Sequence, residues 1–374
     1  MSIAKSILRG DEQAALTLRA LYRDHGYTQY KMNKFEEYDL YVRNKDFLIS
    51  DHIITFTDTS GKLLALKPDV TLSIVKNSEK RAGTNKVYYQ ENVYRVSGRT
   101  HTFREIMQLG LEYIGDVDAF CRFEVLTLAA KSLKAISPNA VLDVSHLGIV
   151  SAVLDSIGVT DATRQGLLRC IGEKNVHELR AIATSANVAP ERLDALCALV
   201  SSYGKPAAVL PSLMPLLYPL APANILSDFS ALLTALESSP VGDIVRLDFS
   251  VIGNIGYYNG LVFKGFVDGV PDGLLSGGEY NGLMRKMGKS EDAIGFAVYL
   301  DALERFHKND ADVDVDAVVL YGEGTDLALL GRAMDDLVAS GKTVAAHRAV
   351  PTGLRYRELL KFDEKEGTLI ETDD

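Results

Sequence analysis

The stretch KVYYQENVYRVSGRTHTFREIMQLGLEYIG, residues 86–115, decides the fold of this chain. Two runs of strand-forming residues flank a polar turn from Ser97 to Arg104, which predicts two strands joined by that turn. Polar and apolar residues alternate in the second run, residues 105–114. One of its faces carries Met107, Leu109, Leu111 and Tyr113, and the other carries Gln108, Gly110 and Glu112. A strand with one apolar face is half-buried, as strands of antiparallel sheets usually are.

The polar face of this strand predicts a trough on the sheet. Gln108 and Glu112 are separated by about 13 Å at ~3.3 Å per residue. Gly110 between them leaves room for a group that lies flat on the sheet. The same alternation fits an exposed sheet face on which the two polar side chains are merely solvated. The pattern alone leaves both interpretations open.

Composition disfavours several classes of protein. The chain has 374 residues, 47% of them hydrophobic, which predicts a large core domain with smaller pieces. A formal net charge of -10 disfavours a general nucleic-acid-binding protein, because phosphate contacts need a concentrated basic surface. Three distant cysteines without CxxC spacing predict buried thiols in a reducing compartment. The seven histidines lack the spacing of a metal site, so we expect no metal.

The chain shows no pattern that targets it to a membrane. Its first residues lack the apolar segment of a signal peptide. The most apolar long stretch, residues 207–225, contains four prolines. They argue against a membrane helix and for an extended or broken helix at the surface. We therefore expect a cytoplasmic protein that contacts no membrane.

The remaining pattern predicts a β-rich core interrupted by helices. Leu and Ala recur at helical spacing over residues 148–238, which predicts a helical insertion. Asp69 is well placed to cap a helix over residues 70–77. The other predicted elements are helices over 11–25, 116–135 and 299–307, strands over 38–42, 53–57, 63–66, 141–147, 244–249, 257–267 and 293–298, and a glycine-rich loop over 274–283.

A charged segment, residues 308–316, predicts a linker between two parts of the chain. We expect a core domain over residues 1–310, which includes the insertion, and a small C-terminal α/β unit over residues 315–374. The pattern of this unit predicts a strand, a helix and a second strand, followed by a polar end.

Spacing alone predicts no reaction. The glycine-rich SGGEYNG, residues 276–282, lacks the Lys-Ser/Thr ending of a P-loop and the GxGxxG spacing of a dinucleotide site, so we expect no nucleotide cofactor. No nucleophile signature occurs. Five carboxylates could supply acid–base pairs, but spacing does not bring any two of them together: Asp58, Asp69, Glu91, Glu105 and Glu112.

Several separated segments together resemble histidyl-tRNA synthetase, a class II aminoacyl-tRNA synthetase. Residues 94–115 resemble class II motif 2, a strand, an arginine-bearing loop and a strand. LKPDVT, residues 66–71, resembles the Leu-Arg-Pro-Glu-x-Thr segment, and IGYYNGLVFKGF, residues 255–266, resembles the histidine-specific tyrosine loop. SGGEYNGLMRKMG followed by AIGFAVYLDAL resembles the Gly-Gly-Arg-Tyr-Asp loop that leads into motif 3.

The resemblance implies a fold and a set of binding residues. It covers roughly residues 5–140 and 240–305. The implied fold is α+β, a class II synthetase-like antiparallel sheet flanked by helices, with the helical insertion and the small C-terminal unit added. In that family the matching residues bind the α-phosphate of ATP, the amino acid, its α-amino group and its imidazole. The implied histidine-binding set is Asp69, Thr71, Arg95, Gln108, Glu112, Tyr257 and Tyr258.

Several positions depart from the synthetase pattern, and two of them point away from its reaction. Gly253 and Ala302 stand where active synthetases carry arginines that contact the reacting phosphate and ATP. Glu279 replaces the arginine of the Gly-Gly-Arg loop, and Asn33 replaces the motif 1 proline. Positioned arginines are the main means of stabilising charge at a phosphate, so their loss predicts that adenylation is lost.

The combined pattern is similar to the synthetase-like regulatory subunit of short-form ATP phosphoribosyltransferase. That resemblance implies a non-catalytic partner of the short catalytic subunit, which carries out the first step of histidine biosynthesis. It also implies histidine as feedback effector, a homodimer within a hetero-oligomer, and no nucleic-acid partner. Asp69 would bind the α-ammonium, and Glu112 and Tyr258 the imidazole. Arg95, Arg104 or the partner subunit would bind the carboxylate. The alternatives are a divergent active histidyl-tRNA synthetase and a synthetase-like protein with another activity or a scaffold role.

Overall fold

The chain divides into two compact units, Met1–His307 and Lys308–Asp374, each described here by itself. The computed structural model describes residues 8–48, 53–78, 84–96, 102–253, 257–306, 313–363 and 367–372. The larger unit is built on a nine-stranded sheet, in which only the pairs β1–β5 and β7–β9 are parallel. In spatial order its strands are β1 (Thr28–Gln29), β5 (Asn85–Val96), β6 (Phe103–Gly115), β12 (Asp292–Tyr299), β11 (Leu275–Glu279), β10 (Leu261–Val267), β7 (Ala140–His146), β9 (Val245–Asp248) and β8 (Tyr203–Gly204).

The predicted strand pair is the long antiparallel pair β5 and β6. Val87 lies opposite Glu112 and Arg95 opposite Arg104, so the pairing extends over nearly the whole of both strands. Residues 97–101 of the predicted turn lie outside the described part of the chain. Leu109 and Leu111 are fully buried on the apolar face of β6, as the alternation predicted.

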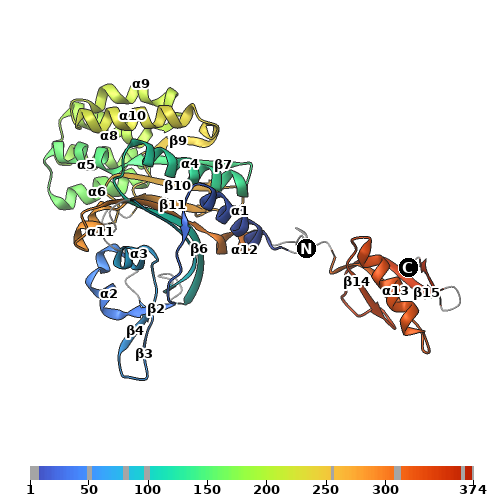
Figure 1. The fold of residues 1–374 in the computed structure, drawn as a ribbon. Coiled ribbons are helices and arrows are strands. Elements are labelled where there is room, and N and C mark those ends of the chain that lie inside the picture. The colour runs from blue at the N-terminus through green and yellow to red at the C-terminus, as the bar shows by residue number, and fades with distance from the viewer. Residues whose placement is uncertain are drawn as a thin grey trace. The chain divides into compact units, whose positions relative to one another are not determined.

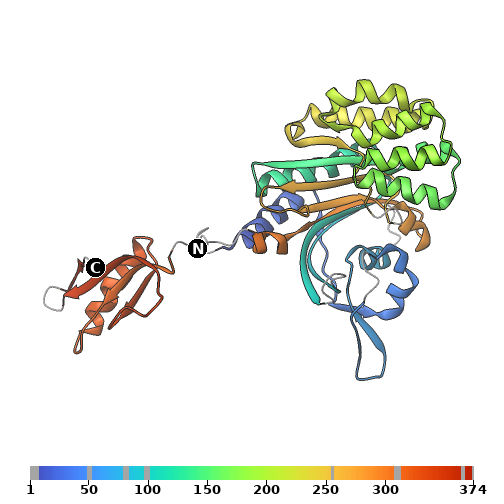
Figure 2. The same ribbon diagram turned by 180° about the vertical axis from the view of Figure 1, so that it is seen from behind.

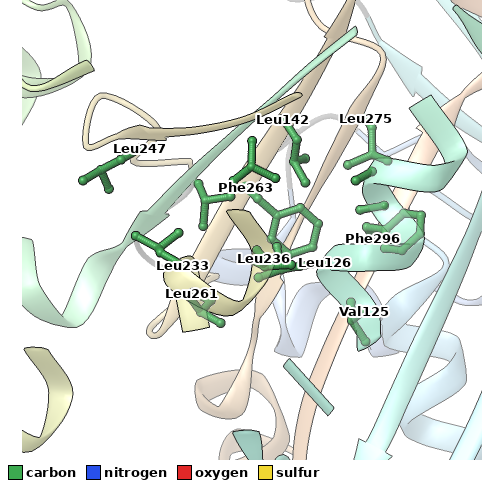
Figure 3. Packing of buried hydrophobic residues seen from close by; sticks show 14 of the residues in the cluster. Val125, Leu126, Leu142, Leu233, Leu236, Leu247, Leu261, Phe263, Leu275 and Phe296 are labelled. Carbon is green, nitrogen blue, oxygen red and sulfur yellow. The ribbon is translucent and has the colours of Figure 1, made fainter. Parts of the chain in front are cut away.

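Helices α1 (Gly10–Asp24), α4 (Ala119–Ile136) and α12 (Leu300–Phe306) cover that apolar face (Figure 1 and Figure 2). Asp118 caps α4 by accepting a hydrogen bond from the Cys121 N–H at 2.8 Å. Figure 3 shows how the helices and strands contribute to this main core: Val125, Leu126, Leu142, Leu233, Leu236, Leu247, Leu261, Phe263, Leu275 and Phe296.

The opposite face of the sheet carries a second, smaller core. It is formed with α2 (Tyr38–Arg43), the 3-10 helix η2 (Lys45–Phe47), α3 (Thr71–Asn77) and α11 (Asn281–Lys286). A separate three-stranded sheet adjoins these helices and consists of β2 (Phe35–Glu37), β4 (Leu63–Leu66) and β3 (Thr55–Thr57). Val87 and Tyr89 of β5 and Ile114 of β6 supply the sheet side of this core.

The stretch between β7 and β9 is helical, apart from the two residues of β8. A 3-10 helix η3 (Gly242–Ile244) then leads into β9. The helices of this region are α5 (Leu147–Ile157), α6 (Asp161–Gly172), α7 (Val176–Ser185), α8 (Pro190–Ser201), α9 (Pro206–Leu217) and α10 (Ala223–Glu237).

The proline-rich stretch in this region is a broken helix. The break lies between α9 and α10, where Pro219 and Pro222 occur, whereas α9 continues through Pro211 and Pro215. Because α9 buries Leu213, Met214 and Leu217 on one face, packing outweighs the local cost of its internal prolines.

Two predictions of local structure in the larger unit are wrong. Residues 38–42, predicted as a strand, form helix α2, because one helical turn buries Tyr41 completely. The predicted glycine-rich loop contains strand β11. A Cβ at Gly277 would lie 2.4 Å from the Gly295 carbonyl oxygen, so the glycine allows close strand pairing rather than a turn.

The smaller unit has a sheet in the order β14-β13-β15-β16 and one helix. Its predicted polar end is wrong, because those residues form two further strands, of which β15 buries Leu360 and Phe362 against the helix. Asp326 caps the helix through the N–H groups of Ala328 and Leu329. The elements are β13 (Val315–Leu320), α13 (Leu327–Ala339), β14 (Val344–His347), β15 (Tyr356–Asp363) and β16 (Thr368–Glu371).

None of the helices in the described ranges is both long and apolar enough to cross a membrane.

Candidate functional site

A cavity of about 1100 Å³ lies on the face of the large sheet opposite α1 and α4. The structure brings all seven residues of the predicted histidine-binding set to its wall: Asp69, Thr71, Arg95, Gln108, Glu112, Tyr257 and Tyr258. Gln108 is 4% exposed and Glu112 is 2% exposed. The interpretation of β6 as carrying a solvated polar face is therefore wrong, and its polar side chains line a cavity.

Glu112 is held by two hydroxyl groups. Thr71 Oγ1 donates a hydrogen bond of 2.8 Å to Glu112 Oε1, and Tyr280 Oη donates one of 2.7 Å to Oε2. Burial raises the pKa of Glu112 to about 8, although both hydrogen bonds favour the ionised form. Near neutral pH burial therefore favours the neutral acid form of this carboxyl.

Asp69 is positioned by the start of α3. Its Oδ1 accepts a hydrogen bond of 2.9 Å from the Leu72 N–H, which confirms the predicted capping role. Burial raises the pKa of Asp69, against the opposing effects of this N–H and of the Arg95 guanidinium. Arg95 is itself oriented by a hydrogen bond of 3.0 Å from Nε to the Pro68 carbonyl. An acid and a guanidinium thus share one end of the cavity.

Glycines form the floor beneath the functional side chains. A Cβ at Gly295 would lie 1.8 Å from Glu112 Oε2, and one at Gly278 would lie 2.7 Å from Cδ1 of Tyr258. The space at Gly110, which the sequence assigned to a ligand, is filled by Tyr89, whose hydroxyl would be 2.6 Å from an added Cβ. That prediction is wrong because Tyr89 lies directly across the strand pair from Gly110.

An aromatic cluster forms the wall that faces Glu112. The rings of Tyr257 and Tyr258 meet edge to face at 4.7 Å between centroids, and Tyr280 is 5.9 Å from Tyr257. Sequence reasoning missed Tyr280 and Tyr89 as lining residues. Tyr280 is the tyrosine of SGGEYNG, which the sequence analysis had singled out. Because a loop was predicted there, the direction of its side chain could not be assigned.

Three of the positions that depart from the synthetase pattern lie on different faces of the large sheet. Gly253 and Ala302 line the cavity, so neither contributes a guanidinium to it. Glu279 instead points to the helix-covered face, where it forms an ion pair with Arg122 of α4. Among the described residues, the cationic side chains that line the cavity are Arg95, Arg104, Lys174 and Lys264.

No metal site is visible in the described ranges, since no three His, Cys, Asp or Glu side chains lie in a group that could hold an ion.

Comparison with known proteins identifies the family. Residues 8–303 match the family model described as histidyl-tRNA synthetase. The chain belongs to the histidyl-tRNA synthetase family. A curated relative from Oceanobacillus iheyensis is 25% identical over 284 residues, which is 75% of this chain and 69% of that protein, and it is named ATP phosphoribosyltransferase regulatory subunit. The predicted resemblance to these subunits within the histidyl-tRNA synthetase family is thereby confirmed.

Solved structures share the fold. One from Bacillus halodurans, described as an ATP phosphoribosyltransferase regulatory subunit/histidyl-tRNA synthetase, has a TM-score of 0.75 at 23% identity and covers 96% of this chain and 99% of its own. A chain of an ATP phosphoribosyl transferase (HisG:HisZ) complex from Thermotoga maritima has a TM-score of 0.61 at 18% identity. The match covers 78% of this chain and 97% of that one. These likenesses confirm the predicted class II synthetase-like α+β fold.

Proposed function

We propose that this chain is a regulatory subunit of ATP phosphoribosyltransferase that binds the catalytic subunit and senses histidine. One observation carries the proposal: the seven residues of the predicted histidine-binding set line one cavity, while Gly253 and Ala302 contribute no guanidinium group to it. Guanidinium groups at those two positions are the expected means of stabilising charge during adenylation. The names of the relatives support the same role. In this proposal the chain retains recognition of an amino acid and has lost its own chemistry.

The arrangement of polar groups fits free histidine. In this proposal Asp69 binds the α-ammonium, and Arg95, which lines the same end of the cavity, binds the carboxylate. Glu112, held by Thr71 and Tyr280, binds one nitrogen of the imidazole. Because burial favours the neutral form of Glu112, this group can donate to or accept from the ring according to its tautomer.

Feedback requires that histidine bind two states of the assembly with different affinity. The difference is typically on the order of 1–3 kcal/mol for an allosteric effector. We further propose that the chain acts as a homodimer within a hetero-oligomer with the catalytic subunit. A chain of the same fold comes from a structure described as an ATP phosphoribosyl transferase (HisG:HisZ) complex, which supports a two-component assembly.

The first experiment is a calorimetric titration of the purified full chain with L-histidine, with and without ATP. We expect saturable binding that ATP does not change. Glu112→Ala should abolish it, whereas Glu105→Gln, an exposed carboxylate on the same strand, should leave it intact. Equal histidine affinity in Glu112→Ala and in the unmodified chain would exclude this cavity as the sensor.

The second experiment uses the assembled enzyme. Glu112→Ala should remove inhibition by histidine while the complex with the catalytic subunit assembles as before. If the variant enzyme stays as sensitive to histidine as the unmodified one, the regulatory role does not pass through this site.

A further inference from the structure

The cavity has a second polar end, centred on Asp143 of β7. Asp143 is 7% exposed and lines the cavity, and its Oδ1 is buried without a hydrogen-bond partner. Buried carboxylate oxygens normally accept hydrogen bonds, because an unsatisfied one costs roughly 1–3 kcal/mol. No part of the histidine site uses this group.

The polar neighbours of Asp143 form hydrogen bonds with other groups and leave its Oδ1 without a hydrogen bond. Lys174, in the turn between α6 and α7, donates a hydrogen bond of 2.7 Å to Asp248 Oδ2, and the Ser250 N–H donates one of 2.9 Å to Oδ1. Arg246, beside Asp143 on β9, donates instead to the carbonyls of Asp243 and Val245.

The charged and titratable groups that face Asp143 come from four elements. Lys264 lies directly opposite on β10, with its ammonium 5.2 Å from the centroid of the Phe266 ring. Asp248 and Arg246 come from β9, Lys174 from the turn between α6 and α7, and Tyr203 from β8. Burial and the Asp248 carboxylate together raise the pKa of Asp143 to about 7.

This end is separate from the histidine site. Strands β12, β11 and β10 lie between β6, which carries Glu112, and β7, which carries Asp143. Four strand spacings of ~4.8 Å place the two strands about 19 Å apart. A single amino acid cannot span that distance, so the cavity has room for a second bound group.

We propose that Asp143 is the centre of a subsite for a nitrogen cation, an ammonium or a guanidinium, whose N–H groups donate to the unpaired carboxylate. Such a cation supplies the missing hydrogen bond to Oδ1 as a charge-assisted one, which Lys174, Arg246 and Lys264 do not provide although they lie nearby. Two sources have this chemistry: a free cationic metabolite, and a Lys or Arg side chain of a protein partner. The subsite does not depend on the binding of histidine.

The test for a free ligand titrates the full chain with methylguanidinium chloride, followed by NMR. We expect saturable binding with Kd on the order of 1–10 mM, as for one charge-assisted contact. Asp143→Asn should weaken it at least about tenfold. Asp272→Asn, which removes a carboxylate at the exposed part of the same cavity, should change it less than about threefold. Tetramethylammonium, a cation without N–H donors, should not compete.

The test for a partner side chain compares assembly of the catalytic subunit with the unmodified chain and with Asp143→Asn. If the cation comes from that subunit, the variant should assemble at least about tenfold more weakly, and methylguanidinium should inhibit assembly. Asn keeps the shape of a protonated Asp, so thermal unfolding should show the variant folded. If methylguanidinium binding and assembly are both unaffected by Asp143→Asn, the proposal is overturned.

Discussion

The carboxylate of Glu112 lies directly over Gly295 of the neighbouring strand, so close that an added Cβ would be 1.8 Å from Oε2. The two residues face each other in the β6–β12 register. A buried acid can occupy this position only because the opposite residue has no side chain. The depth of the site is thus set by a backbone position as much as by its polar residues.

Gly295→Ala should therefore displace Glu112 and weaken histidine binding at least about tenfold, with a stability loss of roughly 1–3 kcal/mol from overpacking. Calorimetry and denaturant unfolding measure the two effects. Gly282→Ala on α11 is the matched control, since its nearest contact would be an ordinary 3.9 Å from Phe47. Unchanged histidine affinity in Gly295→Ala would contradict the placement of the ligand against Glu112.

Stability should fall as pH rises because of Glu112. Its pKa is raised in the folded chain from 4.5 to about 8, so the folded state holds a proton that the unfolded state releases. Because the pKa is higher in the folded state, the stabilising contribution of Glu112 is fully present below pH 4.5 and is lost as pH rises through about 8. In Glu112→Gln the free energy of unfolding should lack this fall with pH, which amounts to at most about 1.4 kcal/mol per pH unit. Parallel stability–pH curves for the two proteins over that range would refute the prediction.

Lys67 and Glu91 anchor the segment that carries Asp69 and Thr71. They form an ion pair in which Lys67 is 1% exposed and Glu91 is 16% exposed. Glu91→Leu should cost about 3–5 kcal/mol, because it leaves the more deeply buried charge unpaired. Lys67→Met should cost less, and the double variant should cost less than the sum of the two. Urea unfolding of the four proteins measures the cycle, and strict additivity would show that the pair is not coupled.

The chain should not catalyse histidine-dependent exchange between ATP and pyrophosphate. Gly253→Arg should not restore it, since residue 253 has φ of +51° and an added Cβ would lie 3.3 Å from the Tyr258 ring. Exchange of radioactive pyrophosphate into ATP is the assay, with an active histidyl-tRNA synthetase as positive control. Exchange above the protein-free background would favour the alternative of a divergent active enzyme.

The sequence predicted those parts of the site that lie within single segments. Alternation in β6 placed Gln108 and Glu112 on one face, and the Pro68-Asp69 step predicted the cap on α3. Local pattern failed at residues 38–42 and in β11, where burial of Tyr41 and close pairing at Gly277 override the local signal. In both cases the deciding contacts come from residues distant in the sequence.

The sequence by itself determined the apolar face of β6, the helical region after β7 and the residue types that line the cavity. Only the tertiary structure brought β6, the start of α3, the paired tyrosines and Tyr280 around one carboxylate, and left Asp143 unpaired at the other end of the cavity. The physical reason is that periodicity reports which face of an element is buried, whereas hydrogen bonding and burial of charge depend on neighbours that the order of strands in the sheet supplies.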